Sequence, residues 1–103
     1  MQRYDCIIHG AGMVGLSLGC ALAQGGLRVM VIDARPLRRW SADGWDQRVS
    51  AVTVASERIL NRLGVWDQIL QGRAGPFRGI SAWDGPGNGE VHFDAIELGE
   101  PRL

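Results

Sequence analysis

Apolar residues change their spacing several times along the chain, and each change predicts a new element. From Tyr4 to His9 a short continuous apolar run ends at a glycine, which is typical of a strand covered on both faces. Over residues 13–24 the apolar positions recur at helical spacing, and two glycines follow where a helix commonly ends. Residues 27–32 form a second β-branched, apolar run. The order strand, helix, strand predicts a βαβ unit.

The middle of the chain is irregular at first and then helical. Residues 34–47 contain a proline, three arginines, two tryptophans and no clear period, so we expect an irregular excursion there. Helical spacing returns over about residues 52–63 and predicts a second helix, which a glycine ends. We expect residues 65–70 to add a further turn and residues 72–76 to form a linker.

The last third of the chain changes to strand-like alternation. Residues 77–84 and 90–94 alternate between apolar and polar positions, and a glycine-rich stretch separates them, which predicts a β-hairpin. An antiparallel hairpin after a parallel βαβ unit indicates the entrance to a second domain. The pattern therefore predicts an α/β fold with a Rossmann-like segment over residues 1–75 and the start of an antiparallel sheet over residues 76–103.

The turn between the first strand and the first helix carries a dinucleotide-binding pattern. Residues 10–15 read G-x-G-x-x-G, and Asp33 stands at the end of the next strand. Gly10 permits the tight turn, Gly12 lets the backbone approach a pyrophosphate, and Gly15 lets the helix pack closely on the sheet. The pyrophosphate is expected at the helix N-terminus, and the ribose hydroxyls at the carboxylate. The residues expected to contact the dinucleotide are Gly10, Gly12, Met13, Val14, Gly15, Asp33, Ala34 and Arg35.

The same residues leave two alternatives open. A glycine-rich turn in an α/β protein can be purely structural, although the strand, the helix and the acid together favour a nucleotide. The carboxylate of Asp33 argues against NADP at this site, because it would repel a 2′-phosphate, and the neighbouring Arg35 weakens that argument slightly. The fingerprint alone does not separate FAD from NAD.

Composition narrows the class of protein further. With 103 residues the chain is short for an enzyme that holds a dinucleotide and a second substrate, so we expect part of a larger protein. The formal net charge is zero, which gives no electrostatic reason to expect nucleic acid. The apolar opening is too short and too often interrupted by glycine to span a membrane. We expect Cys6 and Cys20 to be buried, reduced thiols, and the sequence offers no metal site.

No residue of this chain is assigned a catalytic role. His9 is expected to be structural, His92 to be half-exposed, and the four tryptophans to serve in packing. No nucleophile beside a base can be argued from the spacing. The protein part supplies binding, and a cofactor would supply the chemistry.

Several motifs resemble the ubiquinone-biosynthesis hydroxylases, FAD-dependent aromatic monooxygenases built like p-hydroxybenzoate hydroxylase. The similar segments are residues 4–15, 33–36, 46–51 and 91–95, and the later two resemble the branch that hydroxylates demethoxyubiquinol. His9 departs from the family, which usually has an aliphatic residue there. The resemblance covers essentially the whole chain but only about the first quarter of such an enzyme.

The resemblance implies FAD rather than NAD, and it implies that Arg48 reaches the pyrophosphate or the ribityl region of the flavin. It further implies NAD(P)H as a transient reductant, molecular oxygen, and a quinol or phenol substrate with a lipid tail. Other proteins of ubiquinone biosynthesis become candidate partners. A cytoplasmic protein is expected, with possible peripheral contact to the inner membrane.

Two other functions stay open at this point. An NAD-dependent dehydrogenase would share the fingerprint, but it would continue with further βαβ units instead of an early hairpin. The second alternative is a truncated, non-catalytic remnant that serves at most as an interaction module.

Overall fold

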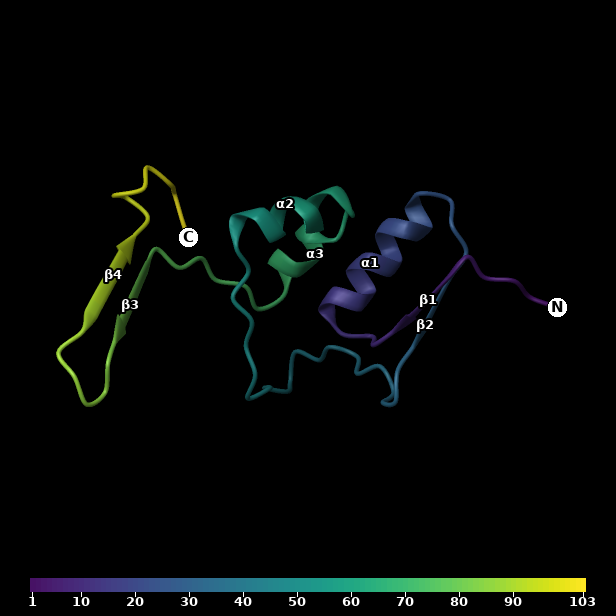
Figure 1. Ribbon diagram of the computed structural model, residues 1–103, viewed down its shortest axis with the longest axis horizontal. Helices are drawn as coiled ribbons and strands as arrows, with labels where there is room; N and C mark the ends of the chain where they lie inside the picture. The colour runs from purple at the N-terminus through teal and green to yellow at the C-terminus, as the bar shows by residue number, and fades with distance from the viewer.

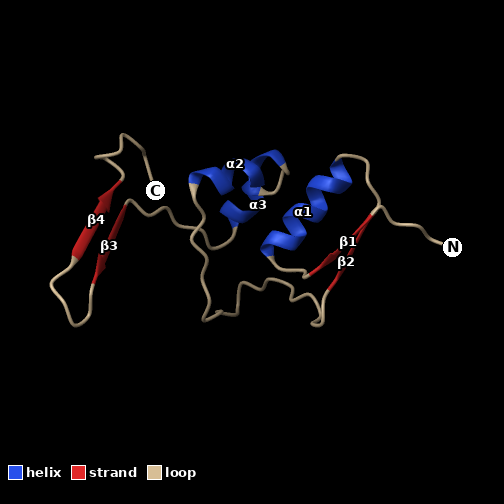
Figure 2. Ribbon diagram, viewed as in Figure 1, coloured by secondary structure: helices blue, strands red, loops and turns tan.

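The computed structural model describes all residues 1–103, and its helices and strands follow one another along an elongated chain (Figure 1). Figure 2 separates the helices from the strands by colour. The elements in chain order are β1 (Cys6–His9), α1 (Met13–Gln24), β2 (Val29–Ile32), α2 (Val54–Arg62), α3 (Trp66–Gln71), β3 (Gly79–Trp83) and β4 (Glu90–Asp94).

The N-terminal elements form a βαβ unit. β1 and β2 pair in parallel, with Cys6 opposite Val29 and His9 opposite Ile32. α1 covers one face of this pair, and its buried Gly19 allows a close approach. A Cβ atom at Gly19 would lie 3.2 Å from Val31 Cγ2. The helical bounds expected from the sequence, 13–24, are confirmed.

The expectation of a first strand covered on both faces is wrong. α1 packs on one face only, so side chains of the other face stay open, and Ile7 is 61% exposed. Both strands are also shorter at their outer ends than expected. There the Asp5 carboxylate accepts a hydrogen bond from the Arg28 backbone N–H at 2.8 Å. At this end a side-chain carboxylate takes the place of a backbone carbonyl as the acceptor. The regular parallel pairing of β1 with β2 therefore begins only at Cys6.

The helices α2 and α3 form a short pair beside α1. Thr53 caps α2, because its side chain accepts a hydrogen bond from the Ser56 backbone N–H. Gly64, with φ +79°, turns the chain between the two helices. The side-chain amide of Gln24 donates to the Leu63 carbonyl at 3.0 Å, which ties the end of α1 to this turn.

The strands β3 and β4 form a second, separate sheet. They pair antiparallel, with Ile80 opposite Phe93 and Ala82 opposite Val91, so one face of the hairpin is apolar. After β4 the chain folds back, and the Leu103 backbone N–H donates to the Phe77 carbonyl at 3.0 Å. The expected hairpin is confirmed, and the fold is a mixture of helices and strands with one parallel and one antiparallel sheet.

Two expectations about individual side chains are wrong. Cys20 is exposed, because nothing covers the outer face of α1, and Cys6 on β1 is only half-buried. Neither cysteine takes part in a disulfide. His92 is exposed rather than half-exposed, and its ring Nδ1 lies 2.7 Å from the Ser81 hydroxyl across the hairpin.

Little of the chain is buried in this arrangement. Its radius of gyration is 18.0 Å, against about 13 Å for a compact domain of similar length. Only Gly19, Leu60 and Ala95 are buried, one in each of three successive parts of the chain. No helix combines the length and apolar character needed to cross a membrane.

Candidate functional site

The turn that follows β1 requires glycine at two positions for different reasons. Gly10 has φ +116°, a backbone conformation that L side chains rarely adopt. A Cβ atom at Gly15 would lie 1.9 Å from the Gly10 carbonyl oxygen, so no larger residue fits there without a backbone shift. At Gly12 no atom lies within 4 Å of the Cβ position, and the backbone is open to the outside.

The first turn of α1 presents backbone donors without acceptors. The N–H groups of Met13, Val14 and Gly15 make no hydrogen bond, and no side chain caps the helix. The first turn contains no acidic residue that would compete for these donors. The regular bonding begins with Leu16, whose N–H donates to the Gly12 carbonyl at 2.9 Å. Unpaired N–H groups at a helix N-terminus are suited to bind an anion.

Asp33 lies at the end of β2 and contacts the glycine turn directly. Its Oδ2 accepts a hydrogen bond from the Ala11 backbone N–H at 2.7 Å, and its Oδ1 accepts one from the Arg35 backbone N–H at 2.8 Å. These two hydrogen bonds, with that from Ala11 the stronger influence, lower the pKa of Asp33. The nearby charges of His9 and Arg35 lower the pKa further. Asp33 is therefore a carboxylate at neutral pH, and each oxygen keeps room for another donor.

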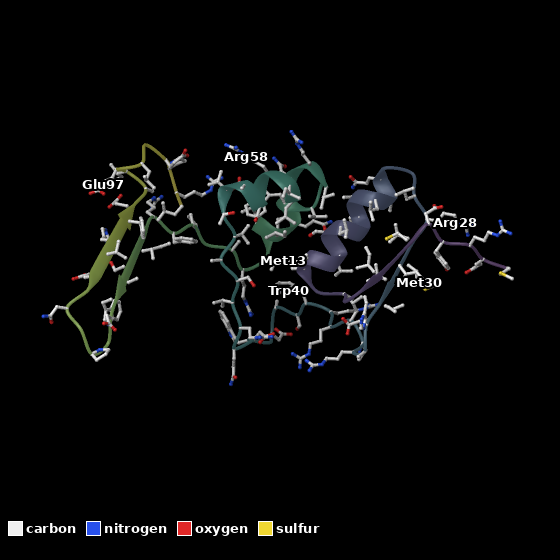
Figure 3. All side chains as sticks on the ribbon, viewed as in Figure 1. Met13, Arg28, Met30, Trp40, Arg58 and Glu97 are labelled. Carbon is white, nitrogen blue, oxygen red and sulfur yellow. The ribbon has the colours of Figure 1, made fainter.

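A shallow hollow lies over the end of β1 and the first turns of α1. Its lining combines backbone of the glycine turn with apolar side chains, so it offers polar donors beside an apolar surface. Figure 3 shows Met13 at the start of α1, where this hollow lies. The lining residues are Ile8, His9, Gly10, Gly12, Met13, Val14, Gly15 and Leu18.

The structure brings most of the predicted binding residues together, and it leaves one apart. The carboxylate of Asp33 accepts hydrogen bonds from Ala11 in the glycine turn and from the backbone of Arg35, and Ala34 lies between Asp33 and Arg35 in the chain. Arg48 lies in the irregular segment between β2 and α2 and is exposed, and no hydrogen bond or ion pair links it to the glycine turn. Its backbone N–H donates to Asp46 Oδ1 at 3.0 Å, a contact within the same segment.

Two residues of the region were missed by sequence reasoning. Ala11 belongs to the site through its backbone N–H, and its place between the first two glycines of the pattern was the available signal. Arg73 contacts the segment that precedes Arg48, and nothing in the spacing of the sequence points to it. The structure contains no group of three His, Cys, Asp or Glu side chains able to hold a metal ion.

The geometry as a whole fits one end of a dinucleotide. Free N–H groups, an open glycine backbone and no competing acid suit a pyrophosphate. The carboxylate of Asp33, held beside the turn, suits the hydroxyl groups of a ribose. These groups can bind and orient a cofactor, and none of them is placed as a nucleophile with a neighbouring base.

Comparison with known proteins identifies similar chains. The chain is 40% identical over 103 residues to the 3-demethoxyubiquinol 3-hydroxylase of Escherichia coli strain K12. This match covers 99% of this chain and 26% of that protein. It is 38% identical over 97 residues to the ubiquinone hydroxylase UbiL of Rhodospirillum rubrum, covering 94% of this chain and 22% of the relative. It is 29% identical over 101 residues to the mitochondrial ubiquinone biosynthesis monooxygenase COQ6 of Rattus norvegicus, in a match that covers 92% of this chain and 21% of the relative.

The chain thus spans about a fifth to a quarter of the length of these curated relatives. The resemblance to ubiquinone-biosynthesis hydroxylases that the motifs indicated is confirmed. The model of the FAD binding domain family matches residues 3–87, which include the glycine turn, Asp33 and Arg48. This match decides between the two dinucleotides that the fingerprint left open: the chain belongs to the FAD-binding domain family.

Proposed function

We propose that this chain binds the ADP half of FAD within a monooxygenase that uses NAD(P)H and hydroxylates an aromatic ring in ubiquinone biosynthesis. The observation that carries the proposal is the first turn of α1, where three N–H groups lack acceptors beside a glycine turn. Because the chain belongs to the FAD-binding domain family, we assign the pyrophosphate of FAD as the anion that these N–H groups bind.

Each binding residue has a distinct task in this proposal. The N–H groups of Met13, Val14 and Gly15 donate to the pyrophosphate, which approaches over the bare backbone of Gly12. Asp33 accepts from the ribose hydroxyls on the oxygen lone pairs that Ala11 and Arg35 leave free.

Arg48 is the remaining binding residue, and we assign it to the pyrophosphate or ribityl region. A guanidinium pairs well with phosphate oxygens, and Arg48 is exposed and forms no ion pair that would compete. Bound FAD supplies the redox chemistry that none of the side chains provides.

The names of the relatives support the substrate class. One is a 3-demethoxyubiquinol 3-hydroxylase and another a ubiquinone hydroxylase, so we assign a quinol or phenol with a lipid tail and molecular oxygen as reactants. A lipid-tailed substrate favours peripheral contact with a membrane, and we include this contact and association with other proteins of ubiquinone biosynthesis in the same proposal.

The proposal also includes a division of the chain. We assign residues 1–75 to a Rossmann-like, FAD-binding segment and residues 76–103 to the beginning of a substrate-domain sheet. The separate pairing of β3 with β4, away from the parallel β1–β2 pair, supports a boundary between them.

The test is flavin binding by the native polypeptide that carries this sequence. We expect a yellow protein whose calorimetric titration prefers FAD over NAD. Arg48→Ala removes one guanidinium–phosphate pair, and we expect a loss of about tenfold in FAD affinity, equivalent to about 1.4 kcal/mol. Asp33→Ala should weaken FAD binding to a similar or greater extent.

The control is Arg58→Ala on α2, where the arginine is exposed and its side chain makes no hydrogen bond or ion pair. Its FAD affinity should equal that of the wild type. A colourless protein that binds NAD would contradict the proposal and favour a dehydrogenase. A folded protein that binds neither dinucleotide would favour the non-catalytic remnant.

A further inference from the structure

Arg73, in the linker after α3, is exposed and contacts an earlier segment of the chain through its guanidinium. Its guanidinium lies over the Trp45 ring, with the Cζ atom 3.8 Å from the ring centroid. The Trp40 ring lies on the same group at 6.0 Å. The guanidinium also donates to the backbone carbonyls of Ala42 and Gly44. These contacts join parts of the chain that are about 30 residues apart.

The contacts hold the segment of residues 40–46 from two sides. The carbonyls of Ala42 and Gly44 accept from the edge of the guanidinium, and the Trp45 ring covers its face. Only a planar group with several donors can satisfy both requirements at once, which is a property of arginine and not of lysine. Figure 3 shows Trp40 on this irregular segment.

A short path of contacts leads from this clasp to Arg48. Asp46 follows Trp45 directly, and its Oδ1 accepts the Arg48 backbone N–H at 3.0 Å. The other carboxylate oxygen of Asp46, Oδ2, lies 3.9 Å from Arg38 Nη1. This ion pair is exposed to solvent and contributes little to stability by itself. The contacts to Arg73 are the ones that join this segment to a distant part of the chain.

We propose that Arg73 is a positioning residue for FAD binding: it clasps residues 40–46 and thereby fixes the backbone that presents Arg48. This inference rests on the proposed function, because it assigns Arg48 to the flavin site. Arg73 itself has no contact with the glycine turn or Asp33. Without the clasp, the irregular segment samples more conformations, and binding of FAD must then order it again.

The experiment measures FAD affinity and limited trypsin cleavage of the native polypeptide that carries this sequence. The variant is Arg73→Lys, which keeps the charge and removes the planar donor pattern. We expect the dissociation constant for FAD to rise about tenfold. We also expect faster cleavage after Arg38, Arg39 and Arg48, located by mass spectrometry, since these bonds lie in or beside the released segment.

The matched control is Arg58→Lys on α2. Arg58 is exposed and projects away from the segment that carries Trp40 (Figure 3). It should change neither the FAD affinity nor the cleavage rate. Equal losses in both lysine variants would overturn the proposal, and so would an Arg73→Lys protein that behaves like the wild type.

A second pair of variants tests the other side of the contact and covers the case in which Arg73→Lys fails to fold. Trp45 is 84% exposed, so its replacement leaves no buried cavity. Trp45→Leu should weaken FAD binding, whereas Trp45→Phe keeps an aromatic face and should restore most of it. In the double variant of Trp45→Leu and Arg73→Lys the loss should stay near that of one substitution, because both break the same clasp.

Additive losses in the double variant, or equal FAD affinities for Trp45→Leu and Trp45→Phe, would contradict the clasp. The two readouts also separate this inference from the proposed function. If the wild type does not bind FAD, the proposed function fails and the positioning role falls with it. If the wild type binds FAD but cleavage and affinity do not change together in Arg73→Lys, only the inference fails.

Discussion

Asp33 is the residue at which fold and binding meet. Its carboxylate accepts N–H groups from Ala11 in the glycine turn and from Arg35 beyond β2. Oδ2 therefore holds the glycine turn against the end of β2. Both carboxylate oxygens keep a free lone pair that can accept a hydrogen bond from a ribose hydroxyl. The acidic residue of the fingerprint is thus structural before any cofactor binds.

The lowered pKa of Asp33 predicts a pH dependence of stability. The hydrogen bonds from Ala11 and Arg35 lower the pKa below the ordinary value of 3.8, so the folded state binds this proton less tightly than the unfolded state. The stabilisation is fully present above about pH 4 and is lost as the pH falls through the lowered pKa. Thermal unfolding followed by circular dichroism between pH 7 and pH 2 measures it.

Asp33→Asn provides the comparison for that measurement. Asparagine keeps one acceptor oxygen but carries no charge, so the variant should be less stable than the wild type at pH 7. The difference between the two proteins should shrink towards pH 2, where the wild-type carboxylate is protonated. A difference that stays constant over the whole range would show that the charge of Asp33 contributes nothing.

At the scale of elements, the start of α1 depends on two glycines with opposite requirements. Gly15 lies against the carbonyl of Gly10, whereas the Cβ position of Gly12 is free of neighbours. Gly15 is needed because the helix packs closely on the turn. Gly12 leaves room for a ligand to approach the backbone. The sequence pattern lists both as glycine and does not distinguish these two reasons.

Alanine substitutions should separate the two requirements. Gly15→Ala places a Cβ 1.9 Å from a backbone oxygen, and we expect a loss of about 1–3 kcal/mol in unfolding free energy from the forced backbone shift. Gly12→Ala should change the stability by less than that and weaken FAD binding about tenfold or more, because the methyl group occupies the approach to the backbone. Denaturant unfolding and FAD titration of both variants provide the measurements. Equal effects of the two substitutions on stability would contradict this division.

Much of the element order was predictable from the sequence, and the reasons are local. α1 follows from apolar spacing, and the hairpin follows from alternation around a glycine-rich turn, so both were predicted correctly. The exposure of Cys20 was not predictable, because it depends on which layers cover the helix. The clasp of Arg73 on Trp45 joins residues with no shared pattern, and only the folded chain brings them together.

At the scale of the whole molecule, the chain is a series of small units with few connections. Its extents are 61 × 30 × 29 Å, and the helical pair lies between the βαβ unit and the hairpin (Figure 1). One ion pair joins the helical pair to the returning C-terminal segment. Arg102 Nη2 and Nε donate to both oxygens of Glu57 on α2, and these hydrogen bonds raise the pKa of Arg102.

Breaking this ion pair should loosen the hairpin from the helices without unfolding either unit. Glu57 Oε1 lies 2.5 Å from Arg102, and the glutamate side chain is only 18% exposed, so the pair is better shielded than the Arg38–Asp46 pair. Glu57→Gln should raise the radius of gyration above that of the wild type in small-angle X-ray scattering and leave the far-ultraviolet circular dichroism nearly unchanged. Glu97→Gln, at an exposed position beyond β4 (Figure 3), is the matched control. An unchanged radius in Glu57→Gln would contradict the role of this ion pair in holding the hairpin to the helical pair.

The sequence by itself determined the βαβ order, the glycine turn, the acidic residue at the end of β2 and the hairpin, because each depends on residues that are close along the chain. It also determined the family, through motifs that the FAD-binding domain match confirms. Tertiary structure alone decided that Asp33 bonds to Ala11, that Gly15 lies against Gly10, and that Arg73 holds Trp45. These contacts depend on how separate elements are placed in space, and residue spacing along the chain carries no record of that placement.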